Sequence, residues 1–169
     1  PSNQGVGRGR TPPIDFSMAD LNPEYLTALY HLVNTSPFPS HLPMRVVEVH
    51  SDRSVVELEV ATCHLQPFGI VHGGVLATLI DTATFWAGFG GIPESAGLVN
   101  VDLKLNYLEA VSSGLLRAEG RLLRAGRSVI YAEASVRSAP GGLVAHGTST
   151  MMVLPGKGLP LKVAKFLSE

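Results

Sequence analysis

The sequence predicts an α+β protein in which a curled, mostly antiparallel β-sheet wraps around one long central helix. Two observations support this fold class. A short amphipathic segment and two strand-like segments precede a long apolar stretch, and four more strand-like segments follow it. The apolar stretch, residues 73–89, has no polar face, so as a helix it must be buried by the sheet. At 169 residues the chain suits one domain with its own core.

The predicted elements begin with a short helix. In LNPEYLTALYHLV, Asn22 is a good N-cap residue and Pro23 suits the first helical position. The helix must end before NTSPFPSHLP, residues 34–43, whose three prolines predict a segment without regular structure. Residues 1–17 are rich in Gly, Pro, Arg and Ser, which predicts a flexible tail.

The strands are predicted from alternating apolar and polar residues and from the turn sequences between them. In LVNVDLKLNYL the odd-numbered residues from Val99 to Tyr107 are apolar or aromatic, and we expect them to face the core. The even-numbered residues from Asn100 to Asn106 should then form a polar face. We expect strands at residues 44–50, 54–60, 98–108, 114–125, 128–138 and 143–153.

The predicted elements divide the chain into four segments. The flexible tail is followed by a helix and a Pro-rich loop at 18–43, and the main α+β domain spans 44–153. Residues 154–169 are expected to form a loosely attached C-terminal tail.

Composition excludes several classes of function. The formal charge is −1 and there is no basic stripe, which argues against binding to nucleic acid or to an anionic membrane. Cys63 is the only cysteine, so an internal disulfide and an all-cysteine metal site are excluded, and a reducing compartment is favoured. The N-terminus has no signal-peptide h-region, and we expect a cytoplasmic protein. The six histidines lack paired metal-ligand spacing, so we expect no metal site.

One carboxylate, Asp81, lies in the middle of the apolar helix. Together with His72 it argues against a membrane span at 70–92, which also lacks basic flanks. A buried carboxylate must be paired, hydrogen-bonded or open to a cleft. It could simply brace a neighbouring strand, or it could act chemically.

Two glycines at the start of the same helix favour the chemical interpretation. The free N–H groups of Gly73 and Gly74 could stabilise a developing oxyanion. Asp81 follows Gly73 by eight residues, roughly 12 Å at helical rise, which is too far to serve the same bound atom. An antiparallel helix from a second subunit would bring its own Asp81 alongside, so the spacing predicts a symmetric dimer.

The pattern HGGVLATLID, followed by the strand VNVDLKLNYLEAV, resembles the hotdog-fold acyl-CoA thioesterases, namely the PaaI-like and 4-hydroxybenzoyl-CoA thioesterase superfamily. The resemblance covers residues 44–153. It implies a curled sheet around a central helix, hydrolysis of a thioester to a carboxylic acid and free CoA, and no cofactor other than the CoA of the substrate. It also implies a homodimer or a dimer of dimers whose active sites lie between subunits.

The resemblance assigns roles residue by residue. Asp81 matches the general base or nucleophile, and Gly73 matches the residue whose N–H polarises the thioester carbonyl. Gln66 matches a residue that positions substrate or water, and Asn100 falls where relatives carry a residue that orients the water. His72 either takes part in catalysis or braces the loop that leads into the helix.

The contacts with substrate follow less directly. The turn RAGRS contains Arg124, Arg127 and Ser128, and in similar proteins such a turn lies near the nucleotide and phosphates of CoA. Gly74 is a further substrate-binding candidate. Phe85 could line the acyl pocket, although an apolar side chain at this place in the helix favours core packing.

Other kinds of protein compete with this interpretation. A serine hydrolase is disfavoured because no G-x-S-x-G motif is present. The main alternative is a hotdog protein that binds acyl-CoA as a sensor or scaffold without hydrolysing it. The sequence leaves open the acyl group, the choice between dimer and tetramer, and whether Asp81 is nucleophile or base.

Overall fold

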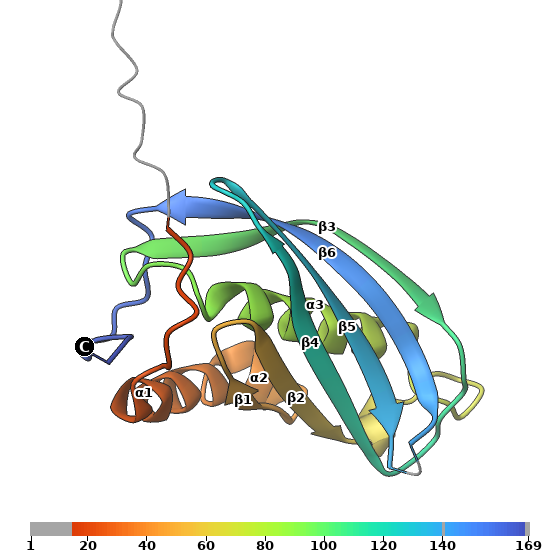
Figure 1. Ribbon diagram of the computed structural model, residues 1–169. Helices are drawn as coiled ribbons and strands as arrows, with labels where there is room; N and C mark the ends of the chain where they lie inside the picture. The colour runs from red at the N-terminus through yellow and green to blue at the C-terminus, as the bar shows by residue number, and fades with distance from the viewer. Residues whose placement is uncertain (1–14, 140, 168–169) are drawn as a thin grey trace, which may run out of the picture.

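A computed structural model describes residues 15–139 and 141–167 (Figure 1). Six antiparallel strands form one curled sheet in the order β1-β2-β4-β5-β6-β3, and helix α3 lies in its concave face. This confirms the predicted α+β architecture. The element bounds are α1 Pro23–Asn34, α2 Pro37–His41, β1 Met44–Val49, β2 Arg53–Glu59, η1 Thr62–His64, α3 Gly73–Phe89, β3 Ala96–Tyr107, β4 Leu115–Ala125, β5 Val129–Ser138 and β6 Leu143–Pro155.

The central helix α3 forms the core together with the inner face of the sheet. Leu79, Ile80 and Ala83 are fully buried, as an apolar helix without a polar face requires. Gly120 of β4 lets the sheet approach α3 closely, because a Cβ at this position would lie 2.2 Å from the Ala83 carbonyl oxygen. Ser54 of β2 donates a 2.7 Å hydrogen bond to the same oxygen. These contacts hold α3 at one depth and rotation within the sheet.

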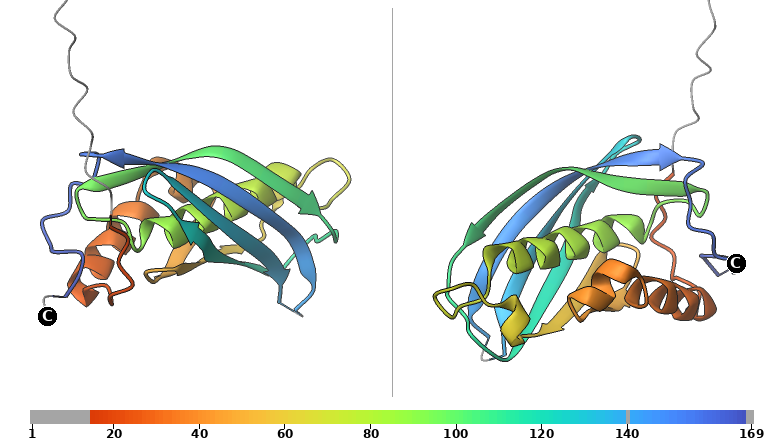
Figure 2. Two further views of the ribbon diagram at one scale, coloured as in Figure 1. Left: turned by 45° about the horizontal axis from the view of Figure 1, so that its top comes forward. Right: turned by 180° about the vertical axis from the view of Figure 1, so that it is seen from behind.

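The N-terminal helices lie beside α3 at one end of the concave face (Figure 2). Helix α1 begins as predicted, with the Asn22 side chain accepting a hydrogen bond from the Glu24 amide at 3.0 Å. The expectation that the prolines prevent regular structure is wrong for Pro37–His41, which form α2. Pro37 and Pro39 both lie in the first turn, where a helix needs no N–H donor and the fixed proline φ is favourable.

The six predicted strands match observed strands with no end displaced by more than two residues, but the alternation predicted for β3 is only half correct. A β-bulge at Val101 separates the pairs Asn100–Met151 and Asp102–Thr150. Before the bulge the even-numbered residues face α3, so Asn100 points inward while Val99 is 41% exposed. After it the odd-numbered residues, including Leu103, face the helix as predicted. The extra residue reverses the side-chain alternation.

The C-terminal segment is not loosely attached over its described part. Lys165 is fully buried, and its Nζ donates hydrogen bonds to the carbonyl oxygens of Phe89 and Ile92 at 2.6 and 2.8 Å. The ammonium also lies 4.1 Å from the centre of the Phe89 ring. Burial lowers the pKa of Lys165 to about 7, although the nearby Glu94 carboxylate acts to raise it. The segment therefore caps the C-terminal end of α3.

The fold does not test the other predicted segment boundaries. Most of the predicted N-terminal tail, residues 1–14, lies outside the described residues. Among the described residues no helix combines the length and the apolar character needed to span a membrane.

Candidate active site

Asp81 lies halfway along α3 on the side that faces β3. Its side chain is half-buried, and the Asn100 amide nitrogen, Nδ2, donates a short hydrogen bond to Oδ1 of the carboxylate. The bulge at Val101 makes this contact possible, because without it Asn100 would face away from the helix. The structure thus brings together two of the residues proposed from the sequence.

The orientation of the Asn100 amide follows from its partner. A carboxylate only accepts hydrogen bonds, so the amide must present Nδ2 to Asp81. The other end of the amide, Oδ1, is buried and has no hydrogen-bond partner within residues 15–139 and 141–167. A buried acceptor of this kind requires a donor, and a water molecule would satisfy it.

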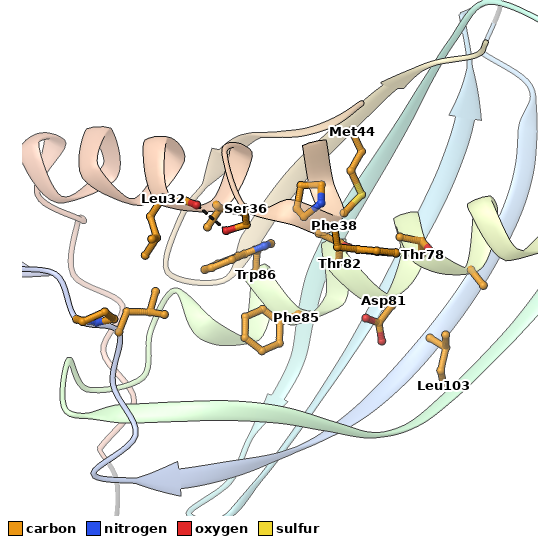
Figure 3. A pocket seen from close by; sticks show the side chains of 15 residues that line it. Leu32, Ser36, Phe38, Met44, Thr78, Asp81, Thr82, Phe85, Trp86 and Leu103 are labelled. Carbon is orange, nitrogen blue, oxygen red and sulfur yellow. Dashed lines mark hydrogen bonds between the residues drawn. The ribbon is translucent and has the colours of Figure 1, made fainter. Parts of the chain in front are cut away.

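Asp81 opens into a cavity of about 780 Å³ between α3, the N-terminal helices and the C-terminal segment (Figure 3). Phe85 contributes to the wall one turn after Asp81, which is where the acyl-pocket hypothesis requires it. Its ring stacks on Phe89 with centroids 5.8 Å apart and meets Trp86 edge-on at 5.0 Å. The lining residues are Leu32, Val33, Ser36, Phe38, Pro39, Met44, Ala77, Thr78, Asp81, Thr82, Phe85, Trp86, Leu103, Leu159 and Pro160.

The N-terminus of α3 is the second part of the candidate site. His72 is the N-cap residue, and its Nδ1 accepts a 2.8 Å hydrogen bond from the Gly74 amide. This contact fits the bracing role that the sequence left open, and a part for His72 in catalysis stays a prediction. The Gly73 N–H has no hydrogen-bond acceptor within the part of the chain that the structure describes. This amide is free to bind a substrate oxygen.

Tyr107 restricts the space around Gly73. Its hydroxyl donates a 3.2 Å hydrogen bond to the Gly73 carbonyl oxygen, and a Cβ on Gly73 would lie 3.0 Å from the phenol ring. Only glycine leaves the ring undisturbed here. Alternation placed Tyr107 on the inner face of its strand, but the sequence gives no signal that it reaches the helix N-terminus.

Gly73 and Asp81 open into different cavities. Gly73 lines a smaller cavity of about 450 Å³ together with Gln66 and Tyr107, whereas Asp81 lines the large one. Asp81 follows Gly73 by eight positions, which corresponds to roughly 12 Å along α3. Within one chain the two groups therefore do not face the same bound atom.

Gln66 lies in the loop that leads to α3. Its Oε1 accepts a 2.9 Å hydrogen bond from the Phe68 amide, which closes a tight turn and leaves the side-chain NH₂ as the available donor. Because Gln66 and Gly73 line the same cavity, the structure brings this second pair of predicted residues together.

The residues proposed to bind CoA lie elsewhere. Arg124, Arg127 and Ser128 are exposed at the tip of the β4–β5 hairpin, and they do not line the cavities of Asp81 or Gly73. A role in substrate binding therefore stays a prediction for all three. Among the described residues no cluster of His, Cys, Asp or Glu could hold a metal ion.

Comparisons with known proteins identify the family that this chain matches. Residues 68–145 match the family described as the Thioesterase superfamily. The crystal structure of thioesterase HI1161 from Haemophilus influenzae has a TM-score of 0.73 and 26% sequence identity, covering 80% of this chain and 94% of that chain.

Two relatives extend the comparison. Rv1847 of Mycobacterium tuberculosis is 30% identical over 96 residues, which are 55% of this chain and 69% of the relative. The 1,4-dihydroxy-2-naphthoyl-CoA hydrolase of Listeria monocytogenes is 26% identical over 110 residues, which are 65% of this chain and 89% of the relative. The matched residues include Gly73, Asp81 and Asn100. By sequence and by fold, this chain belongs to the thioesterase superfamily and is a hotdog-fold thioester hydrolase.

Proposed function

We propose that this protein hydrolyses acyl-CoA thioesters in active sites shared between two subunits, with Asp81 from one subunit and Gly73 from the other. The observation that carries the proposal is the division of the candidate site within one chain. Asp81 with Asn100 and Gly73 with Gln66 form two half-sites in separate cavities. An antiparallel α3 from a second copy would join each half-site to the complementary one.

The free edge of the sheet supports such a dimer. Strand β3 is 12 residues long, and within the described part of the chain it pairs with β6 on one side only. Long edge strands without a covering element are rare in monomers because they pair with other chains. Val101 is 64% exposed on this strand, which adds apolar surface to the same edge. Pairing of β3 with β3 of a second copy would also set α3 beside its symmetry mate.

The outer face of the sheet supports further association into a dimer of dimers. Val99, Met152 and Val129 are cross-strand neighbours on β3, β6 and β5, and each is at least 41% exposed. Contiguous exposed apolar side chains of this kind mark interaction surfaces. The dimer needs only the β3 edge, so this patch remains available for a second interface.

The chemistry follows from the two half-sites. The Gly73 N–H binds the thioester carbonyl oxygen and stabilises the negative charge that develops on it, an effect typically worth about 10²- to 10³-fold in rate. Asp81 accepts a proton from a water molecule as the water oxygen bonds to the carbonyl carbon. The C–S bond then breaks, and the CoA thiolate leaves and takes up a proton. Hydrolysis consumes only water, so the reaction requires no redox cofactor.

A covalent route uses the same residues. The Asp81 carboxylate attacks the carbonyl carbon, CoA thiolate leaves, and water hydrolyses the resulting mixed anhydride. In both routes Asn100 holds one carboxylate oxygen through Nδ2, which leaves the other oxygen for the reaction. The unpartnered Oδ1 of Asn100 supports a further role in orienting the water.

The remaining predicted residues assist binding. The free NH₂ of Gln66 lies in the cavity of Gly73 and can donate to the thioester or to water. His72 and Gly74 hold the helix N-terminus in shape through their mutual hydrogen bond. Arg124, Arg127 and Ser128 remain candidates for the phosphates of CoA, because exposed arginine side chains can form charge-assisted hydrogen bonds with phosphate oxygens.

The central test replaces Asp81 with its uncharged isostere. We expect Asp81→Asn to stay folded, to keep binding acyl-CoA and to lose thiol release by a factor on the order of a hundred or more, because base and nucleophile are both removed. Thiol release is followed with Ellman's reagent. Asp20→Asn is the matched control, since it makes the same change at an exposed position outside both cavities and away from β3. Undiminished hydrolysis by Asp81→Asn would overturn the assigned role, and failure of the unmodified protein to hydrolyse any acyl-CoA would favour a binding-only protein.

A further inference from the structure

The walls of the large cavity come mainly from parts of the chain outside the thioesterase-family match. Helices α1 and α2 precede residues 68–145, and the C-terminal segment follows them. In Figure 3 Asp81 and Leu103 lie at one end of the cavity and Leu32 lies at the other. The cavity therefore leads away from Asp81 toward elements outside that match. The lining residues outside the match are Leu32, Val33, Ser36, Phe38, Pro39, Met44, Leu159 and Pro160.

The polar groups of the cavity are concentrated near Asp81. Thr78 and Thr82 flank Asp81 on α3, one turn before it and one residue after it. The Thr78 hydroxyl proton is already used in a 2.9 Å hydrogen bond to the Gly74 carbonyl oxygen. Ser36 is the only polar side chain that the N-terminal helices and the C-terminal segment contribute to the described wall, and its hydroxyl donates to the Leu32 carbonyl oxygen at 2.7 Å. In the far part of the cavity the described residues leave one side-chain donor without an intramolecular acceptor, the indole N–H of Trp86.

From this arrangement we infer that the preferred substrates carry an unbranched aliphatic acyl chain, whose tail lies between α1, α2 and the C-terminal segment. The inference rests on the proposed function, because the thioester must lie at Asp81. An aliphatic tail needs only apolar contacts, which the far wall supplies. A hydroxylated aromatic acyl group would lose the hydrogen bonds of its hydroxyl to water, and the far wall offers it at most the single indole N–H of Trp86 in return.

The far wall is held in place, so it should impose a limit on chain length. Trp86 is 7% exposed and packs edge-on against Phe89 with ring centroids 5.2 Å apart. Leu159 of the wall lies a few residues before Lys165 in the sequence. The hydrogen bonds of buried Lys165 hold this C-terminal segment against the end of α3. A pocket with fixed walls discriminates among chain lengths better than a flexible one.

The first experiment measures kcat/KM for butanoyl-, hexanoyl-, octanoyl- and decanoyl-CoA and for benzoyl- and 4-hydroxybenzoyl-CoA. We expect kcat/KM to rise about fourfold for each added methylene until the cavity is filled. We expect 4-hydroxybenzoyl-CoA to be hydrolysed at least about fivefold less efficiently than benzoyl-CoA, because its hydroxyl loses more hydrogen bonds to water than the far wall can replace.

The second experiment shortens the cavity. Leu32→Trp adds bulk at the far end, and we expect it to lower the ratio of decanoyl- to butanoyl-CoA hydrolysis by about tenfold or more. His31→Trp is the matched control, because the neighbouring residue on α1 is exposed and does not line the cavity. This variant should keep the ratio of the unmodified protein. Circular dichroism of both variants checks that the fold is retained.

The outcomes separate the two proposals. Hydrolysis that is equal for all chain lengths, or that is best for 4-hydroxybenzoyl-CoA, would overturn the inference about substrate class and leave the catalytic proposal intact. A chain-length ratio that Leu32→Trp leaves unchanged would show that the tail binds elsewhere. Absence of hydrolysis with every thioester would instead overturn the proposed function itself.

Discussion

Mixing two inactive variants should restore activity if each active site is shared between subunits. Asp81→Asn removes the carboxylate half of the site. Gly73→Val keeps the backbone N–H but places a side chain against the Tyr107 ring, which lies only 3.0 Å from where the first side-chain carbon would be, and so obstructs the oxyanion half. Each homodimer then carries two damaged sites, whereas a heterodimer carries one intact site and one site with both changes.

The expected recovery follows from the separation of the two halves. About 12 Å of helix lies between Gly73 and Asp81, whereas a catalytic base must reach its proton within about 3 Å. One chain therefore cannot complete a site alone. A random mixture contains heterodimers in about half of its dimers, and one of their two sites is intact, so the mixture should regain about a quarter of the unmodified activity.

The assay co-expresses the two variants with different affinity tags. Tandem purification isolates the heterodimer, which should have about half of the activity of the unmodified dimer per mole, measured by thiol release from octanoyl-CoA. A matched control combines Asp81→Asn with Asn100→Ala. Both residues belong to the same half-site, so this pair should show no recovery.

A Gly73→Val and Asp81→Asn heterodimer no more active than its parents would refute the shared site. So would equal recovery in the control pair, because that result would mean that subunit mixing restores folding rather than chemistry.

Two further predictions concern the ends of α3. The pKa of Lys165 is about 7 in the folded chain and 10.5 in the unfolded chain. Between these two pH values unfolding takes up a proton. The free energy of unfolding should therefore rise by about 1.4 kcal/mol per pH unit across that window. Urea denaturation from about pH 6 to about pH 9 measures this slope. Lys165→Met should abolish the slope. Lys162→Met changes an exposed position of the same segment and should keep it. At the other end, His72→Ala should lower the free energy of unfolding by about 1 kcal/mol because the Gly74 amide loses its acceptor, whereas His72→Asn supplies another cap. Loss of hydrolysis in a stably folded His72→Asn variant would instead give His72 a chemical role.

Much of the fold could be predicted because its signals are local. Alternating residues mark the strands, and a helix without a polar face must be surrounded by them, which together specify a sheet curled around α3. Asn22 and Pro23 mark the start of α1 in the same local way. The prolines of α2 misled the prediction because their effect depends on position within the helix, and a pattern of residue types does not reveal where the first turn falls.

The same distinction between local signals and tertiary contacts applies to the candidate site. By itself the sequence determined that Asp81 is a carboxylate in an apolar helix, eight residues after a glycine at the helix start, and this spacing predicts a site that is shared between two subunits. Only the tertiary structure decided that Asn100 turns inward at the bulge, that Tyr107 closes over Gly73 and that Lys165 is buried against the end of α3. These contacts join residues that are 19, 34 and 76 positions apart. Periodicity describes which face of one element is apolar, whereas contacts between distant residues depend on how the elements pack, so the sequence pattern of neither partner specifies them.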